Sequence, residues 1–242
     1  MIRAVTFDFW NTLYAEGPSL PRRRQRRVEY AAGHLMGVGA GVAERQLEYA
    51  FEIVSRDIEH LRETRHASLS AEDVGRRVAR VVGLTLEPAQ ATRLGDLISV
   101  AGREEPPVPI EGAREALSAL HGRVKTAIIC DTGLTLGHDL YAIMEADGIA
   151  QLLDHFTFSN QTGTTKPELR QFHYTLHRLG CRPDQAVHVG DLESTDVAGA
   201  KAAGLRAIRV VGPDQDPATD ADASIASVGE VLDVLKAWGL ET

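Results

Sequence analysis

AVTFDFWNTL (residues 4–13) contains a short apolar run that ends at Asp8 and is followed by the turn-forming pair Asn11 and Thr12. Such a run predicts a buried β-strand whose carboxyl end presents an acidic side chain. Ligands of open parallel sheets bind beyond the carboxyl ends of the strands. Asp8 is therefore the first candidate for a functional residue.

The segment from residue 21 to residue 104 has a helical pattern and no strand pattern. Its apolar residues recur at spacings of three and four, which predicts four amphipathic helices. Ser70 followed three residues later by Asp73 resembles a capping box, and Gly83 predicts where that helix ends. This helical block separates the first strand from the rest of the chain.

Helical and strand patterns alternate after a proline-rich break at residues 104–109. Alternation of this kind predicts right-handed βαβ units and a parallel sheet. The predicted fold class is therefore α/β, a Rossmann-like doubly wound parallel sheet with an inserted α-helical cap domain. We expect strands at 124–130, 155–159, 186–191 and 205–211, and helices at 111–121, 136–146, 167–179, 195–203 and 228–238.

The break also sets the expected domain boundaries, because proline neither donates to a sheet nor continues a helix. Residues 1–15 and 105–242 form the expected core domain, and residues 16–104 form the expected cap domain. A length of 242 residues is enough for one large domain or two small ones.

Composition and charge exclude several classes of protein. The chain has 26 Lys and Arg residues against 34 Asp and Glu residues, a formal net charge of −8, so we expect no nucleic-acid partner and no membrane. Its two cysteines, Cys130 and Cys181, exclude a disulfide framework and favour a reducing compartment. Neither a secretory signal nor an apolar stretch of roughly 18 residues is visible. We therefore expect a cytoplasmic protein, as a monomer or a homodimer.

Polar residues follow the predicted strands at their carboxyl ends. Carboxylates gathered at one edge of a sheet raise one another's pKa unless a cation lies between them, and a lysine or a metal ion must supply it. Oxygen ligands without His or Cys nearby favour Mg²⁺, which binds carboxylates together with substrate phosphate. The residues in question are Asp8, the segment 130–133, Lys166, Asp191 and Asp196.

Four segments in order, FDFWNTL, ICDTG, TKP and GDLESTD, resemble the four motifs of the haloacid dehalogenase-like hydrolases. The helical insertion resembles that family's cap in the C1 position, so the resemblance spans essentially the whole chain. Each motif alone is common, but their order, spacing and placement at strand ends are specific together. The resemblance implies a hydrolase that uses Mg²⁺ and acts on a small anionic phosphorylated substrate.

The resemblance also implies roles for individual residues. Asp8 is the implied nucleophile and Lys166 the implied charge-neutralising lysine, and these are the two catalytic residues. Cys130, Asp131 and Thr132 form the implied substrate-binding segment, with the phosphate-binding hydroxyl position at Cys130 or Thr132. The implied ligands of Mg²⁺ are Asp8, the backbone carbonyl of Trp10, Asp191 and Asp196, with Asp196 as either a ligand or a partner of Lys166.

Two positions depart from the family pattern. Most phosphatases of this family have a second aspartate two residues after the nucleophile, which protonates the leaving oxygen, and Trp10 stands there. An indole N–H is no general acid, and losing such an acid typically slows a reaction by roughly 10²–10⁴-fold. Cys130 stands where serine or threonine is usual, and a thiol is a weaker hydrogen-bond donor. Either the leaving group needs no acid, as in an acyl, enol or aryl phosphate, or the cap supplies one from Glu29 or His34.

The run PRRRQRR at residues 21–27 is the strongest basic cluster. We interpret it as the solvated face and entrance of the first cap helix. The functional alternative is a patch that guides phosphate or carboxylate groups to the mouth of the site, since arginine binds both bidentately.

Three functions remain open on the sequence. The first is a Mg²⁺-dependent phosphatase-type hydrolase that acts on a small phosphorylated metabolite through an aspartyl-phosphate intermediate at Asp8. The second is a catalytically weak ligand-binding or regulatory protein, which the departures at Trp10 and Cys130 favour. The third is hydrolysis of a carbon–halogen bond, because an aromatic residue at the Trp10 position resembles the dehalogenase branch. The metal-type motif GDLESTD counts against the third.

Overall fold

The computed structural model of the chain describes residues 1–212, 216 and 218–240. The strands are β1 (Ala4–Phe7), β2 (Tyr14–Ala15), β3 (Val108–Pro109), β4 (Lys125–Cys130), β5 (His155–Phe158), β6 (Ala186–Gly190), β7 (Arg206–Val210) and β8 (Ala223–Ile225). The α-helices are α1 (Leu20–Gly37), α2 (Glu44–Arg65), α3 (Ala71–Val81), α4 (Pro88–Glu104), α5 (Ala113–Leu120), α6 (Gly137–Ala146), α7 (Ser159–Thr162), α8 (Leu169–Leu179), α9 (Ala198–Ala202) and α10 (Val231–Ala237). Shorter helical turns are η1 (Ala150–Leu152), η2 (Pro183–Gln185), the π-helical turn η3 (Glu193–Val197) and η4 (Val228–Glu230). Among the described helices, none combines the length and the apolarity that a bilayer span requires.

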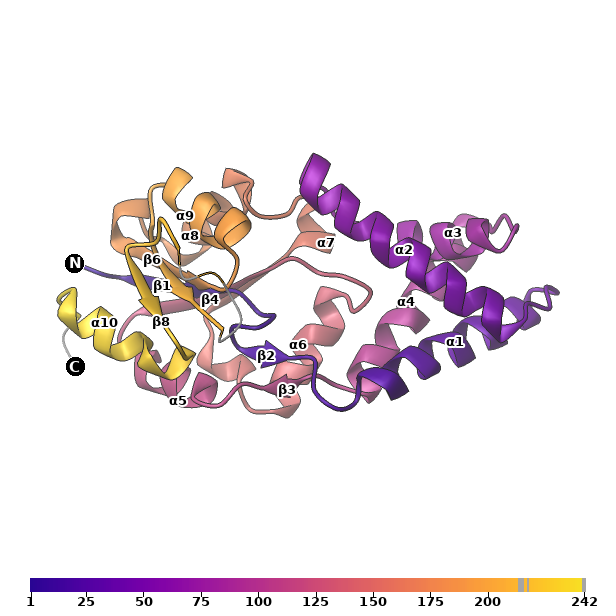
Figure 1. The fold of residues 1–242 in the computed structure, drawn as a ribbon, viewed down its shortest axis with the longest axis horizontal. Helices are drawn as coiled ribbons and strands as arrows, with labels where there is room; N and C mark the ends of the chain where they lie inside the picture. Colours follow the sequence, from indigo (N-terminus) through magenta and orange to yellow (C-terminus); the bar gives the residue numbers. More distant parts are fainter. Residues whose placement is uncertain (213–215, 217, 241–242) are drawn as a thin grey trace.

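Six strands within the described residues form one parallel sheet in the order β5-β4-β1-β6-β7-β8 (Figure 1). The central strand β1 pairs with β4 on one side, where Phe7 lies opposite Ile128, and with β6 on the other, where Phe7 lies opposite Val189. Every residue of β1 is buried, as expected for a parallel strand covered on both faces. Because β4, β1 and β6 are neighbours, the residues that follow these three strands meet at one edge of the sheet.

Helices cover both faces of the sheet. One apolar cluster contains Phe7 of β1 together with Leu117 of α5 and Leu235 of α10. A second cluster contains Phe172 of α8 and Ala200 of α9, packed against the other face. The predicted fold class, a doubly wound α/β sheet with an inserted helical segment, is therefore confirmed.

The predicted strands and helices coincide with observed elements to within a few residues, but the structure adds three short strands. The stretch interpreted as an open break at residues 104–109 contains β3, which pairs antiparallel with β2, so Tyr14 lies opposite Pro109. The three-residue strand β8 extends the sheet beside β7. Strands of two or three residues have no readable periodicity, which is why the sequence does not reveal them. The predicted helix 195–203 is divided between η3 and α9.

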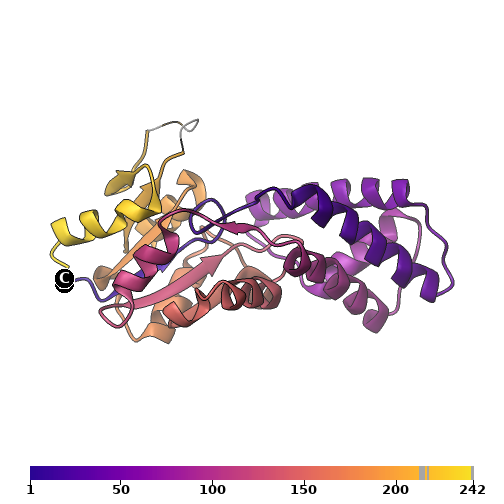
Figure 2. The same ribbon diagram turned by 90° about the horizontal axis from the view of Figure 1, so that it is seen from below.

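Helices α1 to α4 form a bundle beside the sheet, which we call the helical unit (residues 20–104; Figures 1 and 2). It has an apolar cluster of its own, which includes Leu35, Leu47, Val78 and Leu94. This separate cluster supports our proposal that residues 16–104 are a cap domain and that residues 1–15 and 105–242 are the core domain.

The start of α3 follows the predicted capping pattern. The backbone N–H of Asp73 donates to the hydroxyl of Ser70 at 3.2 Å, and the Asp73 carboxylate accepts the backbone N–H of Ser70 at 3.1 Å. The same helix ends before Gly83, whose φ of +79° is the left-handed conformation that glycine tolerates. Local signals in the sequence thus define this helix at both ends.

Candidate active site

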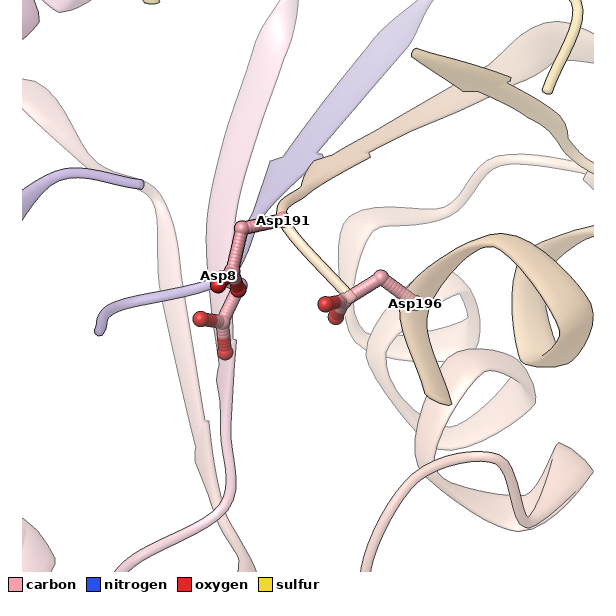
Figure 3. Close-up of side chains that lie close together, drawn as sticks. All are labelled: Asp8, Asp191 and Asp196. Atoms are coloured by element: carbon pink, nitrogen blue, oxygen red, sulfur yellow. The ribbon is translucent and has the colours of Figure 1, made fainter. Parts of the chain in front are cut away.

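Three carboxylates meet at the carboxyl edge of the sheet (Figure 3). Asp8 follows β1, Asp191 follows β6, and Asp196 lies on η3. Each offers an oxygen within 4.8 Å of the others, and all three residues are buried. The sheet order explains the meeting of Asp8 and Asp191, since β1 and β6 are adjacent strands.

Lys166 supplies positive charge among these carboxylates. Its ammonium group donates to Oδ1 of Asp8 and, at 2.7 Å, to Oδ1 of Asp196. The residue is 2 % exposed and comes from the loop between α7 and α8. The backbone N–H of Lys166 also donates to Oδ1 of Asp131 at 3.0 Å, so Asp131 fixes the loop that delivers the lysine.

Asp196 is held on both of its carboxylate oxygens. Oδ1 faces Lys166 and also Nε2 of His188, at 3.0 Å, and Oδ2 accepts the backbone N–H of Leu192 at 3.0 Å. His188 is buried on β6, and its Nδ1 lies 2.8 Å from the hydroxyl of Thr6. Burial lowers the pKa of His188, so its ring is neutral at pH 7. Sequence reasoning gives His188 no role at the site, whereas the structure makes it a partner of Asp196.

Negative charge exceeds positive charge in this cluster. Burial raises the pKa of Asp8 well above its usual range, and the charge of Lys166 opposes only part of that rise. Burial, followed by the charge of Asp196, raises the pKa of Asp191 to about 6. For Asp196 itself, burial is outweighed by Lys166 and His188, and its pKa is lowered. A hard divalent cation fits buried carboxylate oxygens with such an excess of negative charge.

Of the three residues predicted to bind substrate at the end of β4, two line the cavity. Asp131 and Thr132 line the cavity described below, whereas Cys130 belongs to the apolar core. Burial raises the pKa of the Cys130 thiol, which is therefore neutral. The hydroxyl of Thr132 accepts the backbone N–H of Asn160 at 3.2 Å and lies 3.1 Å from the hydroxyl of Ser159. Of the two positions expected to bind phosphate through a hydroxyl, Thr132 is the one at the cavity.

Trp10 lies on the cavity, and its half-buried indole packs edge-on against Phe9 with ring centroids 4.9 Å apart. The two acids considered in the helical unit lie elsewhere. Glu29 is exposed and pairs with an arginine of its own helix, and Nε2 of His34 lies 3.0 Å from a backbone carbonyl of α4. Neither Glu29 nor His34 is among the residues that line the cavity.

A cavity of about 390 Å³ lies between the three carboxylates and the helical unit. The structure corrects the interpretation of residues 21–27 as a solvated face for two of them, because Arg23 and Arg27 are only 1 % and 9 % exposed and line this cavity. Arg62 of α2 is a further lining residue, and since it stands in no motif, sequence reasoning misses it. The charged residues around the cavity are Asp8, Asp131, Lys166, Asp191 and Asp196 from the sheet side, and Glu16, Arg23, Arg24, Arg27, Glu59 and Arg62 from the helical unit and the segment before it.

The family model for haloacid dehalogenase-like hydrolases matches residues 2–204, a range that contains all four motif segments and the helical unit. The chain belongs to this family of hydrolases. It is therefore an enzyme of hydrolytic type, and the cavity over Asp8 is its candidate active site.

One curated relative and two solved structures each match almost the full length of the chain. The chain is 29% identical to the ribulose-1,5-bisphosphate 5-phosphatase of Halopiger xanaduensis, over 97% of this chain and 100% of that protein. Among solved structures, a 2-haloacid dehalogenase from Pseudomonas syringae pv. Tomato has a TM-score of 0.70 at 24% identity and covers 99% of this chain and 100% of its own. A HAD phosphatase from Thermococcus onnurineus has a TM-score of 0.68 at 22% identity, with 99% of both chains covered. At these identities the two structures establish the fold alone.

Replacing Lys166 by methionine should lower the free energy of unfolding by about 3–5 kcal/mol at neutral pH, because buried carboxylates then lose their cation. The double variant Asp8→Asn, Lys166→Met should recover part of that loss. Lys125→Met removes an exposed ion pair with Asp154 and serves as the matched control, with a much smaller expected change. Urea unfolding of the three variants checks this, and similar losses for Lys166→Met and Lys125→Met would contradict the buried ion cluster.

Proposed function

We propose that this chain is a Mg²⁺-dependent phosphatase-type hydrolase that acts on a small anionic phosphorylated metabolite through an aspartyl-phosphate intermediate at Asp8. One observation carries the proposal: the Asp8 carboxylate directly follows the central strand, is bound by Lys166, and is grouped with Asp191 and Asp196 on a cavity. Membership of the hydrolase family and the name of the relative matched over its whole length both support a phosphatase.

The proposed ligands of Mg²⁺ are Asp8, Asp191 and the backbone carbonyl of Trp10, with Asp196 as either a further ligand or a partner of Lys166. When bound, Mg²⁺ supplies positive charge that offsets the charge of the phosphoryl oxygens and of the carboxylates. Both oxygens of Asp196 already accept hydrogen bonds, so we propose that Asp196 acts chiefly by holding Lys166 in place. Burial, followed by the charge of Asp196, raises the pKa of Asp191 to about 6, and a cation beside such a buried carboxylate would favour its charged form, which supports its role as a ligand.

In the proposed reaction, an oxygen of Asp8 attacks phosphorus and the bond between phosphorus and the leaving oxygen breaks. Water then hydrolyses the aspartyl-phosphate and regenerates the carboxylate. The charge of Lys166 favours ionised Asp8 and offsets charge on the transferred group, while the hydroxyl of Thr132 binds a phosphoryl oxygen. Phosphoryl transfer has a loose transition state, so position and charge supply most of the catalysis.

The proton for the leaving oxygen has a candidate source on the cavity. The indole of Trp10 cannot supply it. Asp131 lines the cavity, and burial raises its pKa to about 6, a range suited to proton transfer near neutral pH. We propose that protonated Asp131 binds the substrate and donates to poor leaving groups, whereas acyl, enol and aryl phosphates react without this proton.

Asp8→Asn should lower phosphate release by more than about 10³-fold on every substrate of a phosphate-ester and acyl-phosphate panel, because the variant lacks the nucleophile. The measurement is release of inorganic phosphate by purified protein with Mg²⁺. Absence of any Asp8-dependent release, together with retained binding of Mg²⁺, would support a ligand-binding role instead. Release of halide from 2-haloacids that is insensitive to EDTA would support carbon–halogen hydrolysis.

The rise in melting temperature caused by Mg²⁺ should be larger at about pH 7.5 than at about pH 5, because protons compete with the metal for carboxylates. The pKa of Asp191 is raised to about 6, so the carboxyl is ionised above that pH and protonated below it.

Asp191→Asn should lose most of the rise in melting temperature that Mg²⁺ causes. Without metal at about pH 7.5 it should melt at a higher temperature than the wild type, because a buried carboxylate with a raised pKa destabilises the folded state there. An equal effect of Mg²⁺ at both pH values in the wild type would argue against Asp191 as a ligand.

Asp131→Asn should slow poor leaving groups much more than good ones. We expect a loss of roughly 10²-fold or more for alkyl phosphates, where a general acid contributes most, and little change for acetyl phosphate or p-nitrophenyl phosphate. The measurement is kcat across a series of leaving groups of rising pKa. A uniform loss across the series would assign Asp131 to holding the Lys166 loop rather than to proton transfer.

A further inference from the structure

The arginines at residues 22–27 are divided between two faces of α1. Arg22 and Arg26 lie on the outer face, where they pair with glutamates. Arg23 and Arg27, four residues apart and hence on one face of the helix, are buried and line the active-site cavity.

The two buried arginines differ in their counter-charges. Arg23 donates to the carboxylate of Glu16, which neutralises it. Arg27 donates to neutral groups, the backbone carbonyl of Ile98 at 3.4 Å and the hydroxyl of Thr135 at 2.9 Å. No carboxylate among the described residues lies within the 4.0 Å of its guanidinium that an ion pair requires. Arg27 is thus a buried cation that forms no ion pair with any residue that the structure describes, and the charge of Glu16 acts on it only from a longer distance.

A buried guanidinium without a counter-ion is unfavourable, and buried charges in proteins are normally paired. Burial, followed by the charge of Arg23, lowers the pKa of Arg27 to about 10, so the group remains protonated at neutral pH. A guanidinium has five N–H donors in a planar fork. After the bonds to Ile98 and Thr135, donors of Arg27 remain for a ligand in the cavity that it lines.

The space around Arg27 is large enough for a substrate group. A second cavity, of about 640 Å³, shares Leu20, Arg24, Arg27, Ser55 and Leu134 with the first, so Arg27 borders both cavities. Arg24 is exposed and forms no ion pair with any residue that the structure describes, so it adds a further free charge at this junction. Arg62, by contrast, is paired with a glutamate of its own helix.

We propose that Arg27, Arg24 and the hydroxyl of Thr135 form a binding site for a second anionic group of the substrate. The substrate class is then a small metabolite that carries a carboxylate or a second phosphate in addition to the phosphate that reacts at Asp8. The reacting phosphate lies at the acidic end of the cavity beside Lys166, and the second group lies at its basic end. This inference rests on the proposed phosphatase function and adds the class of its substrate.

The test compares the wild type, Arg27→Met and the control Arg26→Met, which changes an arginine of the outer face. The matched compounds are 3-phosphoglycerate with glycerol 3-phosphate, and fructose 1,6-bisphosphate with fructose 6-phosphate. We expect Arg27→Met to raise KM for the doubly anionic member of a pair by roughly 10- to 100-fold, with a smaller change in kcat. The responding pair distinguishes a carboxylate from a second phosphate. Turnover of p-nitrophenyl phosphate, which has no second anionic group, should be unchanged in Arg26→Met, and in Arg27→Met it should change much less than turnover of the doubly anionic compounds.

An equal loss on p-nitrophenyl phosphate and on the doubly anionic compounds, with a lower melting temperature, would overturn the proposal. Arg27 would then serve only to join the helical unit to the loop after β4. The anion site can be tested without turnover in Asp8→Asn protein. There, doubly anionic compounds should raise the melting temperature more than their singly anionic partners, and adding Arg27→Met should abolish the difference. If doubly anionic compounds give the larger rise in melting temperature but the wild type releases phosphate from no compound, the phosphatase function fails and the anion site stands. If doubly anionic and singly anionic compounds raise the melting temperature equally, the anion site is overturned.

Discussion

The bonds from Lys166 to Asp8 and Asp196 are the constraint on which the site depends. Three carboxylates reach one point from the segments that follow β1 and β6, and their mutual repulsion in a buried environment would favour separation if no cation lay among them. The lysine reaches them because Asp131 fixes the backbone of its loop. One lysine does not neutralise three carboxylates. The folded chain therefore holds an excess of negative charge at the floor of its cavity, which is the condition for binding a cation there.

The central part of the fold can be predicted from the sequence because its signals are local. Apolar runs of four to six residues such as β1 and β4 alternate with helical periodicity, and that alternation allows few topologies other than a parallel sheet. The ends of α3 follow from Ser70, Asp73 and Gly83, which act on adjacent backbone. The pairing of β2 with β3 is different, because it joins Tyr14 to Pro109 across almost a hundred residues and leaves no local pattern. Such long-range pairs become visible only in the folded chain.

The residues of the candidate site likewise include some that can be predicted from the sequence and some that cannot. Asp8 and Asp191 can be predicted because they end adjacent strands of a sheet whose order follows from its connections. His188 cannot, because its role depends on the side chain of Asp196 lying 3.0 Å away, which the sequence spacing alone does not imply. Which of Cys130 and Thr132 lines the cavity also becomes visible only in the structure. Strand β4 ends with Cys130 in the apolar core, and only beyond it does the chain turn toward the cavity.

The cavity is lined by carboxylates and Lys166 at the end near the sheet and by arginines at the end near the helical unit. Helical periodicity brings Arg23 and Arg27 to one face, but only the fold shows that Glu16 neutralises the first and that the second has no carboxylate beside it among the described residues. At the opposite end, Asp8 and Asp191 repel a phosphoryl group except where Lys166 and, on our proposal, Mg²⁺ offset them. A singly charged phosphate would therefore be drawn to either end of the cavity. On our proposal, a substrate with two anionic groups satisfies both ends at once, and its second group, held at Arg27, keeps the first directed at Asp8, where orientation would contribute to rate.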